Sequence, residues 1–132
     1  CNYNSILHWN GETWRIIEKG EESFPTLYAI WGNSTDDIYA AGIYGLVKHF
    51  NGVNWYEVDD IDIDINRFWS SSSTNVYAIG SKGEILHFNG TTWTLIDYDV
   101  VNDLFGIWGS SADDVYIAGV GGTIINYYKT KE

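Results

Sequence analysis

The 132-residue sequence has one cysteine, one proline and no methionine, and only 7 Lys and Arg against 18 Asp and Glu. Its single cysteine, Cys1, excludes an intrachain disulfide and a zinc site built from several cysteines. A formal net charge of −11, without any cluster of basic residues, argues against binding to nucleic acid or directly to an anionic membrane surface. No run of about 18 apolar residues occurs, which is the length that spans a bilayer. The sequence therefore does not indicate a nucleic-acid-binding or membrane-spanning protein.

The absence of methionine, including at position 1, indicates a processed product or a piece of a longer protein. A chain that begins with cysteine looks like a mature bacterial lipoprotein, whose signal peptide is removed just before a cysteine that then carries lipid. The alternative is a fragment that happens to begin there, because no polar linker separates Cys1 from the β-prone residues near Ile6. Cys1 is thus a candidate lipidation site and the only expected route to a membrane. Little Lys and Cys, with abundant Asn, Ser, Thr, Gly, Trp and Tyr, favours an extracellular or cell-surface location.

The apolar content is 45%, enough to bury a core, and 17% of the residues are aromatic, including seven Trp and ten Tyr. Aromatic residues fit the pleated surface of a sheet better than the surface of a helix. This composition predicts an all-β protein.

An internal repeat of about 39 residues is the strongest signal in the sequence. Trp31, Trp69 and Trp108 mark equivalent positions, and glycines recur in step with them at Gly42, Gly80 and Gly119. The copies span residues 27–58, 66–97 and 104–128, and residues 5–18 form the second half of another copy. We treat the chain as a single domain of about three and a half repeats.

Each full copy contains four short β-prone runs separated by turn residues, which predicts a four-stranded antiparallel meander. Asn-Gly pairs at 10–11, 51–52 and 89–90 join the third and fourth runs, and they predict type I′ hairpin turns. Glycine-bearing loops at 42–45 and 80–83 predict another tight reversal between the second and third runs. One such sheet cannot bury both faces alone, so the copies must stack as the blades of a β-propeller.

The repeat reads WGxSxDDVYxxGxxGxIxHxNGxxW, and it resembles the propeller repeats found in many copies in secreted proteins and lipoproteins of bacteria. It is similar in plan to WD-repeat and kelch propellers, and its ending is similar to the Asp-box hairpin of sialidase-like propellers. Phe88 stands where that box carries its Asp, which weakens the sialidase analogy. The resemblance covers essentially the whole chain and implies a propeller fold and a surface location. It implies no chemistry, because propellers host many functions.

The expected strand content of the copies is two, four, four and three, whereas closed propellers have 4–8 blades. We expect the segment Thr13–Glu18 to be available as the missing fourth strand of the last copy. Two interpretations remain open: a partial ring that belongs to a longer propeller, or a ring or filament completed by oligomerisation. Self-assembly is the preferred interpretation.

His8, His49 and His87 share one repeat position, so they lie in different blades and could share one metal ion only if they lined a narrow axis. We therefore expect neither a metal nor a cofactor. The sequence instead predicts that the histidine bonds to the Asp that opens the second strand, Asp37 or Asp114.

The acidic stretch Asp59–Ile65 breaks the repeat, and its alternation predicts a strand with Asp60, Asp62 and Asp64 on a wet face. A Ca²⁺ site is the alternative, but the stretch has no glycine to curl the ligands inward.

No catalytic constellation is evident, so we expect no enzyme. The carboxylate pairs at 36–37 and 113–114 recur with the repeat, which indicates turn chemistry. Repeated tryptophans indicate a core between blades, although Trp9 and Trp55 are candidates for stacking on a sugar.

The residues to which we assign a structural role in the repeat are Trp31, Trp69, Trp108, Gly42, Gly80, Gly119, His49, His87, Asp37 and Asp114. The sequence thus indicates a non-enzymatic propeller outside the cell that assembles with itself or binds another surface protein. A carbohydrate-binding, lectin-like propeller is the alternative, and a piece of a longer glycoside-hydrolase-like propeller ranks third.

Overall fold

The computed structural model describes residues 5–19 and 25–128, which form four antiparallel sheets. Sheet 1 contains β1 (Ile6–Trp9) and β2 (Trp14–Glu18). Sheet 2 contains β3 (Leu27–Ser34), β4 (Asp37–Gly42), β5 (Val47–Phe50) and β6 (Trp55–Glu57). Sheet 3 contains β7 (Ile65–Ser72), β8 (Asn75–Gly80), β9 (Ile85–Phe88) and β10 (Trp93–Ile96). Sheet 4 contains β11 (Leu104–Ser111), β12 (Asp114–Gly119) and β13 (Ile124–Tyr128).

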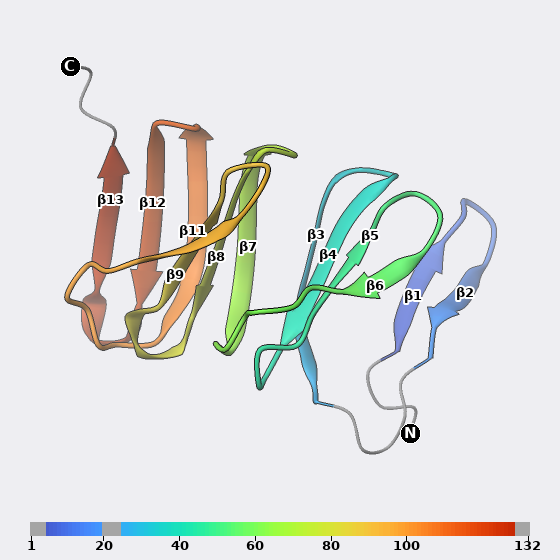
Figure 1. Ribbon diagram of the computed structural model, residues 1–132, viewed down its shortest axis with the longest axis horizontal. Coiled ribbons are helices and arrows are strands. Elements are labelled where there is room, and N and C mark those ends of the chain that lie inside the picture. Colours follow the sequence, from blue (N-terminus) through green and yellow to red (C-terminus); the bar gives the residue numbers. More distant parts are fainter. Residues whose placement is uncertain (1–4, 20–24, 129–132) are drawn as a thin grey trace.

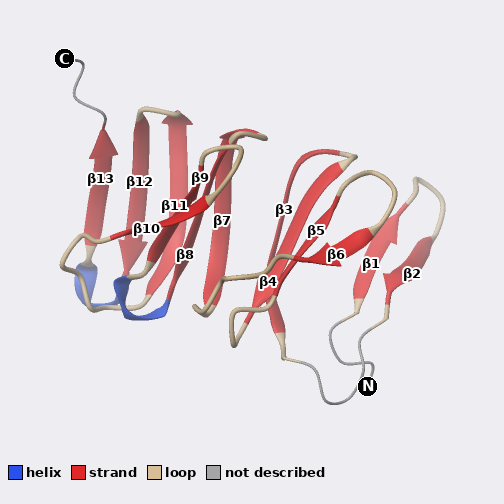
Figure 2. Cartoon of the chain, viewed as in Figure 1, coloured by secondary structure: helices blue, strands red, loops and turns tan. Residues whose placement is uncertain are grey.

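The sheets stand side by side in a row, in chain order, and the described residues do not close into a ring (Figure 1). Within each sheet, neighbouring strands are consecutive in the chain, so every sheet is an up-and-down meander. The only other regular elements described are two 3-10 turns, η1 (Ser81–Gly83) and η2 (Val120–Gly122). They lie at the lower edge of sheets 3 and 4 in Figure 2. No described helix is long and apolar enough to cross a membrane. The all-β meanders agree with the sequence prediction.

The core consists of two apolar layers, one on each face of sheet 3. Alternate residues of β8 enter different layers: Val76 and Ala78 pack toward sheet 2, whereas Tyr77 and Ile79 pack toward sheet 4. β8 is consequently buried from its second residue to its last, although it is only six residues long. Neither layer contains a residue of sheet 1, and β2 is almost wholly exposed.

The Asn-Gly hairpins are present, but their turns differ from the type I′ prediction. Phe50 pairs with Trp55, so the loop has four residues, and Gly52 has a positive φ of 91° while Asn51 does not. The Asn51 side-chain oxygen accepts hydrogen bonds from the backbone N–H groups of Val53 and Asn54, at 3.0 and 2.9 Å. The asparagine is therefore selected for its side-chain acceptor, and not for a left-handed backbone.

The expectation that Thr13–Glu18 completes the last sheet is wrong for this structure. β2 pairs with β1, and β13 pairs with β12, with no further strand on sheet 4. Sheets 1 and 4 lie at opposite ends of the row (Figure 1), because three stacked sheets do not turn the chain far enough to bring its ends together.

The prediction of a strand at Asp59–Ile65 is also wrong, because residues 58–64 form an irregular connection between β6 and β7. Asp60 has a positive φ of 63°, which breaks the extended conformation. The alternation of burial is nevertheless real, since Ile63 and Ile65 are buried while Asp60 and Asp62 are exposed. The isoleucines anchor the connection to the core without pairing it to a neighbouring strand.

Gly83 lies where the turn after β8 meets the connection that enters sheet 4. Its φ is +76°, and a Cβ there would lie 1.8 Å from the Val100 carbonyl oxygen. Gly122, the equivalent residue of sheet 4, has nearly the same φ of +75° but no heavy atom within 4 Å of a Cβ position. The two glycines share a left-handed φ that would strain any other residue, and they differ in crowding.

We expect Gly83→Ala to lower the free energy of unfolding by about 3 kcal/mol or more, and Gly122→Ala by only about 1 kcal/mol. The difference measures how tightly the connection of one sheet packs on the turn of the previous one. Urea unfolding followed by tryptophan fluorescence checks this expectation, and equal losses in the two variants would contradict it.

Candidate functional site

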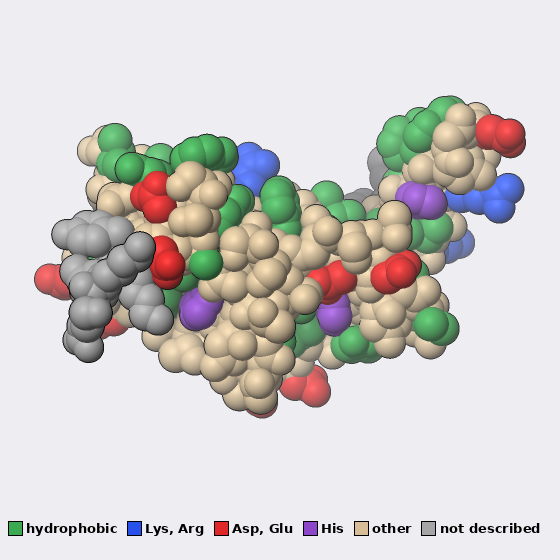
Figure 3. All heavy atoms as spheres, turned by 90° about the horizontal axis from the view of Figure 1, so that it is seen from above, with side chains coloured by type: hydrophobic (Ala, Val, Ile, Leu, Met, Phe, Trp, Pro, Cys, Tyr) green, Lys and Arg blue, Asp and Glu red, His purple; other side chains and the backbone are tan. Residues whose placement is uncertain are grey.

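A groove opens between sheets 2 and 3, at the ends of the strands where the β3–β4 and β7–β8 turns lie. It has a volume of about 1050 Å³. Its walls come from both turns, from the β5–β6 and β9–β10 hairpins, and from the connection after β6. The residues that carry charge or an aromatic ring are Asp36, Asp37, Asp59, Asp60, His49, Tyr39, Tyr56, Phe88 and Trp93. Figure 3 shows this end of the molecule, with acidic side chains beside histidines.

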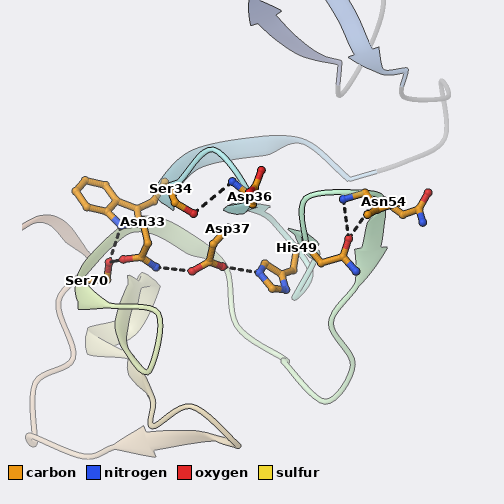
Figure 4. A network of polar contacts seen from close by, with 10 residues as sticks. Asn33, Ser34, Asp36, Asp37, His49, Asn54 and Ser70 are labelled. Atoms are coloured by element: carbon orange, nitrogen blue, oxygen red, sulfur yellow. Dashed lines mark hydrogen bonds and ion pairs between the residues drawn. The ribbon is translucent and has the colours of Figure 1, made fainter.

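A chain of polar contacts runs along one wall of the groove and crosses between the two sheets (Figure 4). His49 Nε2 lies 2.7 Å from Asp37 Oδ1, which is the bond that the sequence predicts. Asn33 donates its amide to the other carboxylate oxygen of Asp37, at 2.8 Å. Ser70 of sheet 3 donates to Asn33, and its hydroxyl accepts the indole N–H of Trp31 at 2.8 Å. The network fixes the rims of the groove and spans the boundary between the sheets.

Tyr39 forms the base of this wall and is 4% exposed. Its ring stacks on His49 with the ring centroids 4.2 Å apart, and it contacts Trp93 of sheet 3 edge-on at 6.0 Å. The pKa of Tyr39 is raised to about 12, mainly because burial disfavours the phenolate and also because Asp37 and Tyr56 lie nearby. Tyr39 therefore stays neutral at physiological pH and serves as a rigid aromatic support.

Sheets 3 and 4 have a hydrogen bond at the position of the His49–Asp37 bond, formed by different residues. His87 Nε2 lies 2.6 Å from the Asn75 side-chain oxygen, and Asn126 donates to Asp114 at 3.2 Å. Tyr77 stacks on His87 just as Tyr39 stacks on His49, with centroids 4.5 Å apart. Because the pair occurs in three sheets, it belongs to the architecture and is not a unique catalytic device.

The repeated tryptophans occupy two environments. Trp31 and Trp69 lie between sheets, whereas Trp108 on the outer face of sheet 4 is exposed.

The repeated glycines Gly42, Gly80 and Gly119 each allow the backbone to approach closely. A Cβ at these positions would lie 1.7 to 2.4 Å from the carbonyl oxygen of the connection that enters their own sheet.

The candidate sugar-stacking residues stand on different sheets. Trp9 is exposed on β1 and is tilted against Trp14, with centroids 5.7 Å apart, while Trp55 is half-buried against Phe50. His8 is exposed on β1, and Cys1 lies outside the described residues. Among the described residues, no three metal-ligating side chains come together.

Two aspartates have a structural role that the sequence analysis did not assign: it placed Asp64 on a wet face, whereas Asp64 is half-buried, and it did not single out Asp103. Asp64 Oδ1 accepts the backbone N–H of Tyr44 in sheet 2, and Asp103 Oδ1 accepts that of Lys82 in sheet 3, at 2.6 and 2.9 Å. Tyr44 and Lys82 have left-handed φ angles of 56° and 55°, so each aspartate caps a strained turn of the preceding sheet. The only available signal was that both aspartates precede the first strand of a copy by the same distance.

No protein-family model and no curated protein sequence matches the chain. Among solved structures it is similar to YCF48 bound to D1 peptide and to YCF48 from Cyanidioschyzon merolae, each with a TM-score of 0.74 and 18% sequence identity. The alignments cover 97% and 96% of this chain, which spans 45% of the length of each of those chains. YCF48 is a β-propeller, so the likeness shows that the stacked sheets of this chain have the propeller fold.

We expect Asp37→Ala to lower the free energy of unfolding by about 2 kcal/mol, because it leaves the Asn33 amide and His49 without their shared acceptor. The neighbouring Asp36 is exposed, and Asp36→Ala serves as the control, with a change within about 0.5 kcal/mol. Urea unfolding of both variants at pH 7 provides the comparison. Equal stabilities would mean that the network contributes nothing.

Burial lowers the pKa of His87, so the unfolded chain binds a proton at a higher pH than the folded chain does. The contribution of His87 to stability is therefore present above the ordinary pKa of 6.5 and is lost as the pH falls below it. We expect the free energy of unfolding to decrease between pH 7 and 5, with a slope of at most about 1.4 kcal/mol per pH unit from this residue. His87→Asn, which introduces the residue found at position 126, should flatten that slope in urea unfolding, and an unchanged slope would refute the assignment.

Proposed function

We propose that the chain is a non-enzymatic protein-interaction module whose groove between sheets 2 and 3 binds a basic, extended segment of a partner protein. The observation that carries the proposal is the composition of the groove wall, which contains four carboxylates and neither Lys nor Arg.

The charges in the groove are not all equally available to a partner. Asp37 is held by Asn33 and His49, whereas Asp36, Asp59 and Asp60 are exposed on two rims of the groove. Three carboxylates that form no ion pair with any described residue surround one opening, and they favour Lys or Arg on the incoming segment. The net charge of −11 also draws a basic partner toward the molecule over a longer range.

The aromatic residues of the groove favour the same class of partner. Tyr56 and Trp93 line the opening and stand on opposite sheets, and the half-buried Trp93 packs against the core below. Aromatic faces attract Arg and Lys through cation–π contacts, and they bury the apolar stems of these side chains. An alternation of acidic rims and aromatic walls thus suits a segment in which basic and apolar residues alternate.

The volume of the groove and the fold both support a peptide as the occupant. A volume of about 1050 Å³ is at the upper end of small-molecule sites. The structure of YCF48 bound to D1 peptide contains a peptide, so a protein with this fold presents a peptide-binding surface. The proposal includes an extracellular or cell-surface location, which is supported by the amino-acid composition.

The test is a titration of the chain with a synthetic peptide of alternating Lys and Leu, with a Glu and Leu peptide of the same length as the charge-reversed control. We expect the Lys peptide alone to quench or shift tryptophan fluorescence, and we expect its affinity to fall as salt is raised. The triple variant Asp36→Asn, Asp59→Asn, Asp60→Asn should weaken binding by about tenfold, at roughly 0.5 kcal/mol for each exposed pair.

A second triple variant, Glu12→Gln, Asp97→Asn, Asp113→Asn, removes the same charge from exposed positions that do not line the groove. We expect it to weaken binding less than twofold. Equal losses in the two triple variants would show that net charge alone attracts the peptide and would overturn the groove as the site. Binding of neutral oligosaccharides, without binding of the Lys peptide, would favour the lectin alternative.

A further inference from the structure

The boundary between sheets 2 and 3 and the boundary between sheets 3 and 4 share one arrangement. On one side a tryptophan of the innermost strand, Trp31 or Trp69, faces the next sheet. On the other side a small residue receives it: Trp31 donates to the Ser70 hydroxyl, and Trp69 lies so close to Gly109 that a Cβ there would be 2.5 Å from its ring. Ser70 and Gly109 are equivalent positions of the repeat, and the equivalent residue of sheet 2 is Gly32.

The same boundaries contain a second pair of repeat positions. Tyr39 projects from sheet 2 onto Phe68 of sheet 3, with ring centroids 5.9 Å apart, and the two residues are 4% and 3% exposed. Tyr77 and Ile107 stand at the equivalent positions of the boundary between sheets 3 and 4, and both pack into its apolar layer.

Two sheet faces display the two halves of this arrangement: the outer face of sheet 4 has no partner sheet among the described residues, and the two-stranded sheet 1 covers the outer face of sheet 2 only in part. On the outer face of sheet 4, Trp108 is 61% exposed and Tyr116 is 45% exposed. On the outer face of sheet 2, Ile30 is 60% exposed, and Gly32 is exposed beside it. The projecting residues are thus exposed on sheet 4 and the receiving residues on sheet 2, so the two faces are complementary and not identical.

We propose that a second copy of this chain docks head to tail, with the outer face of sheet 4 on the outer face of the partner's sheet 2. Trp108 lies over the partner's Gly32, and Tyr116 packs on the partner's Ile30. The contact continues the interface that already joins sheets 2, 3 and 4, which is why the occupant is another copy and not an unrelated protein. The contact is heterologous, so it generates a ring if the rotation closes and a filament if it does not.

Sheet 1 lies next to the receiving face and leaves room on it. The hollow between β1 and β3 has a volume of about 480 Å³ and is lined by residues that include Ile30, Gly32 and Ile38. In the repeat, β1 is equivalent to β13, so β11 and β12 of the docked copy occupy the empty inner positions and β13 displaces the hairpin outward. The ion pair between Glu18 and Lys48 links that hairpin to sheet 2, and a pair of this kind costs little to break.

The experiment uses one variant for each face. Trp108→Asp disables the projecting face, and Ile30→Lys disables the receiving face; both residues are exposed, so both variants should remain folded by circular dichroism. The native mass, measured by light scattering over a range of concentrations, should be a multiple of 15.0 kDa for the unmodified chain and a single 15.0 kDa for each variant alone.

The decisive sample is the equimolar mixture of the two variants. Each retains one intact and complementary face, so the mixture should form a dimer of twice 15.0 kDa and nothing larger. Leu95→Lys, at an exposed apolar position on sheet 3, is the matched control and should assemble like the unmodified chain.

Three outcomes would overturn the proposal. The unmodified chain could remain a monomer at all concentrations, Ile30→Lys could still self-associate through its Trp108 face, or the mixture could remain monomeric. Because neither Trp108 nor Ile30 lines the groove between sheets 2 and 3, the peptide titration with these variants tests the groove separately.

Discussion

The stacking in this molecule depends on the need of each sheet to cover both of its faces. Sheet 3 meets this need completely, because alternate residues of β8 enter the apolar layers on its two sides. Sheet 4 meets it on one side among the described residues, and sheet 1 covers the outer face of sheet 2 only in part, so both outer faces keep large apolar residues in solvent. Burial of apolar area is the main favourable term in folding, so the stability of the chain is concentrated at two boundaries.

The groove is a consequence of the same stacking. The strands of adjacent sheets pack closely along their length, while the turns at their ends diverge and leave an opening lined with polar residues. Partly buried polar side chains near such an opening need partners, and the network from Trp31 to His49 supplies them across the boundary between sheets. The rigid floor of the groove thus follows from the architecture. The exposed residues on its rims are not fixed in this way, so their identity specifies the partner.

The local sequence was enough to predict the strands, the hairpins and the histidine–aspartate bond, because these depend on residues close together or on a fixed repeat position. The type I′ turn predicted for the Asn-Gly loops was wrong. The Asn51 side chain accepts backbone hydrogen bonds, and this stabilises a different turn from the one that the Asn-Gly pair usually forms. The irregular path of residues 58–64 depends on the packing of Ile63 and Ile65, which alternation alone cannot separate from a paired strand. The groove was missed because Asp36, Asp59 and Trp93 meet only after two sheets have stacked.

The backbone contact at the entry of each sheet has a consequence for how such a chain tolerates change. The N–H groups of Ile43, Ser81 and Val120 each donate to the carbonyl of the residue that leads into the same sheet, Thr26, Asp64 or Asp103. This hydrogen bond fixes the strand register within each copy independently. A residue gained or lost in one connection therefore does not change the register of the next copy. Spacings of 38, 39 and 41 residues coexist in one chain for this reason. Gene duplication can therefore add units of slightly unequal length without requiring compensating changes elsewhere.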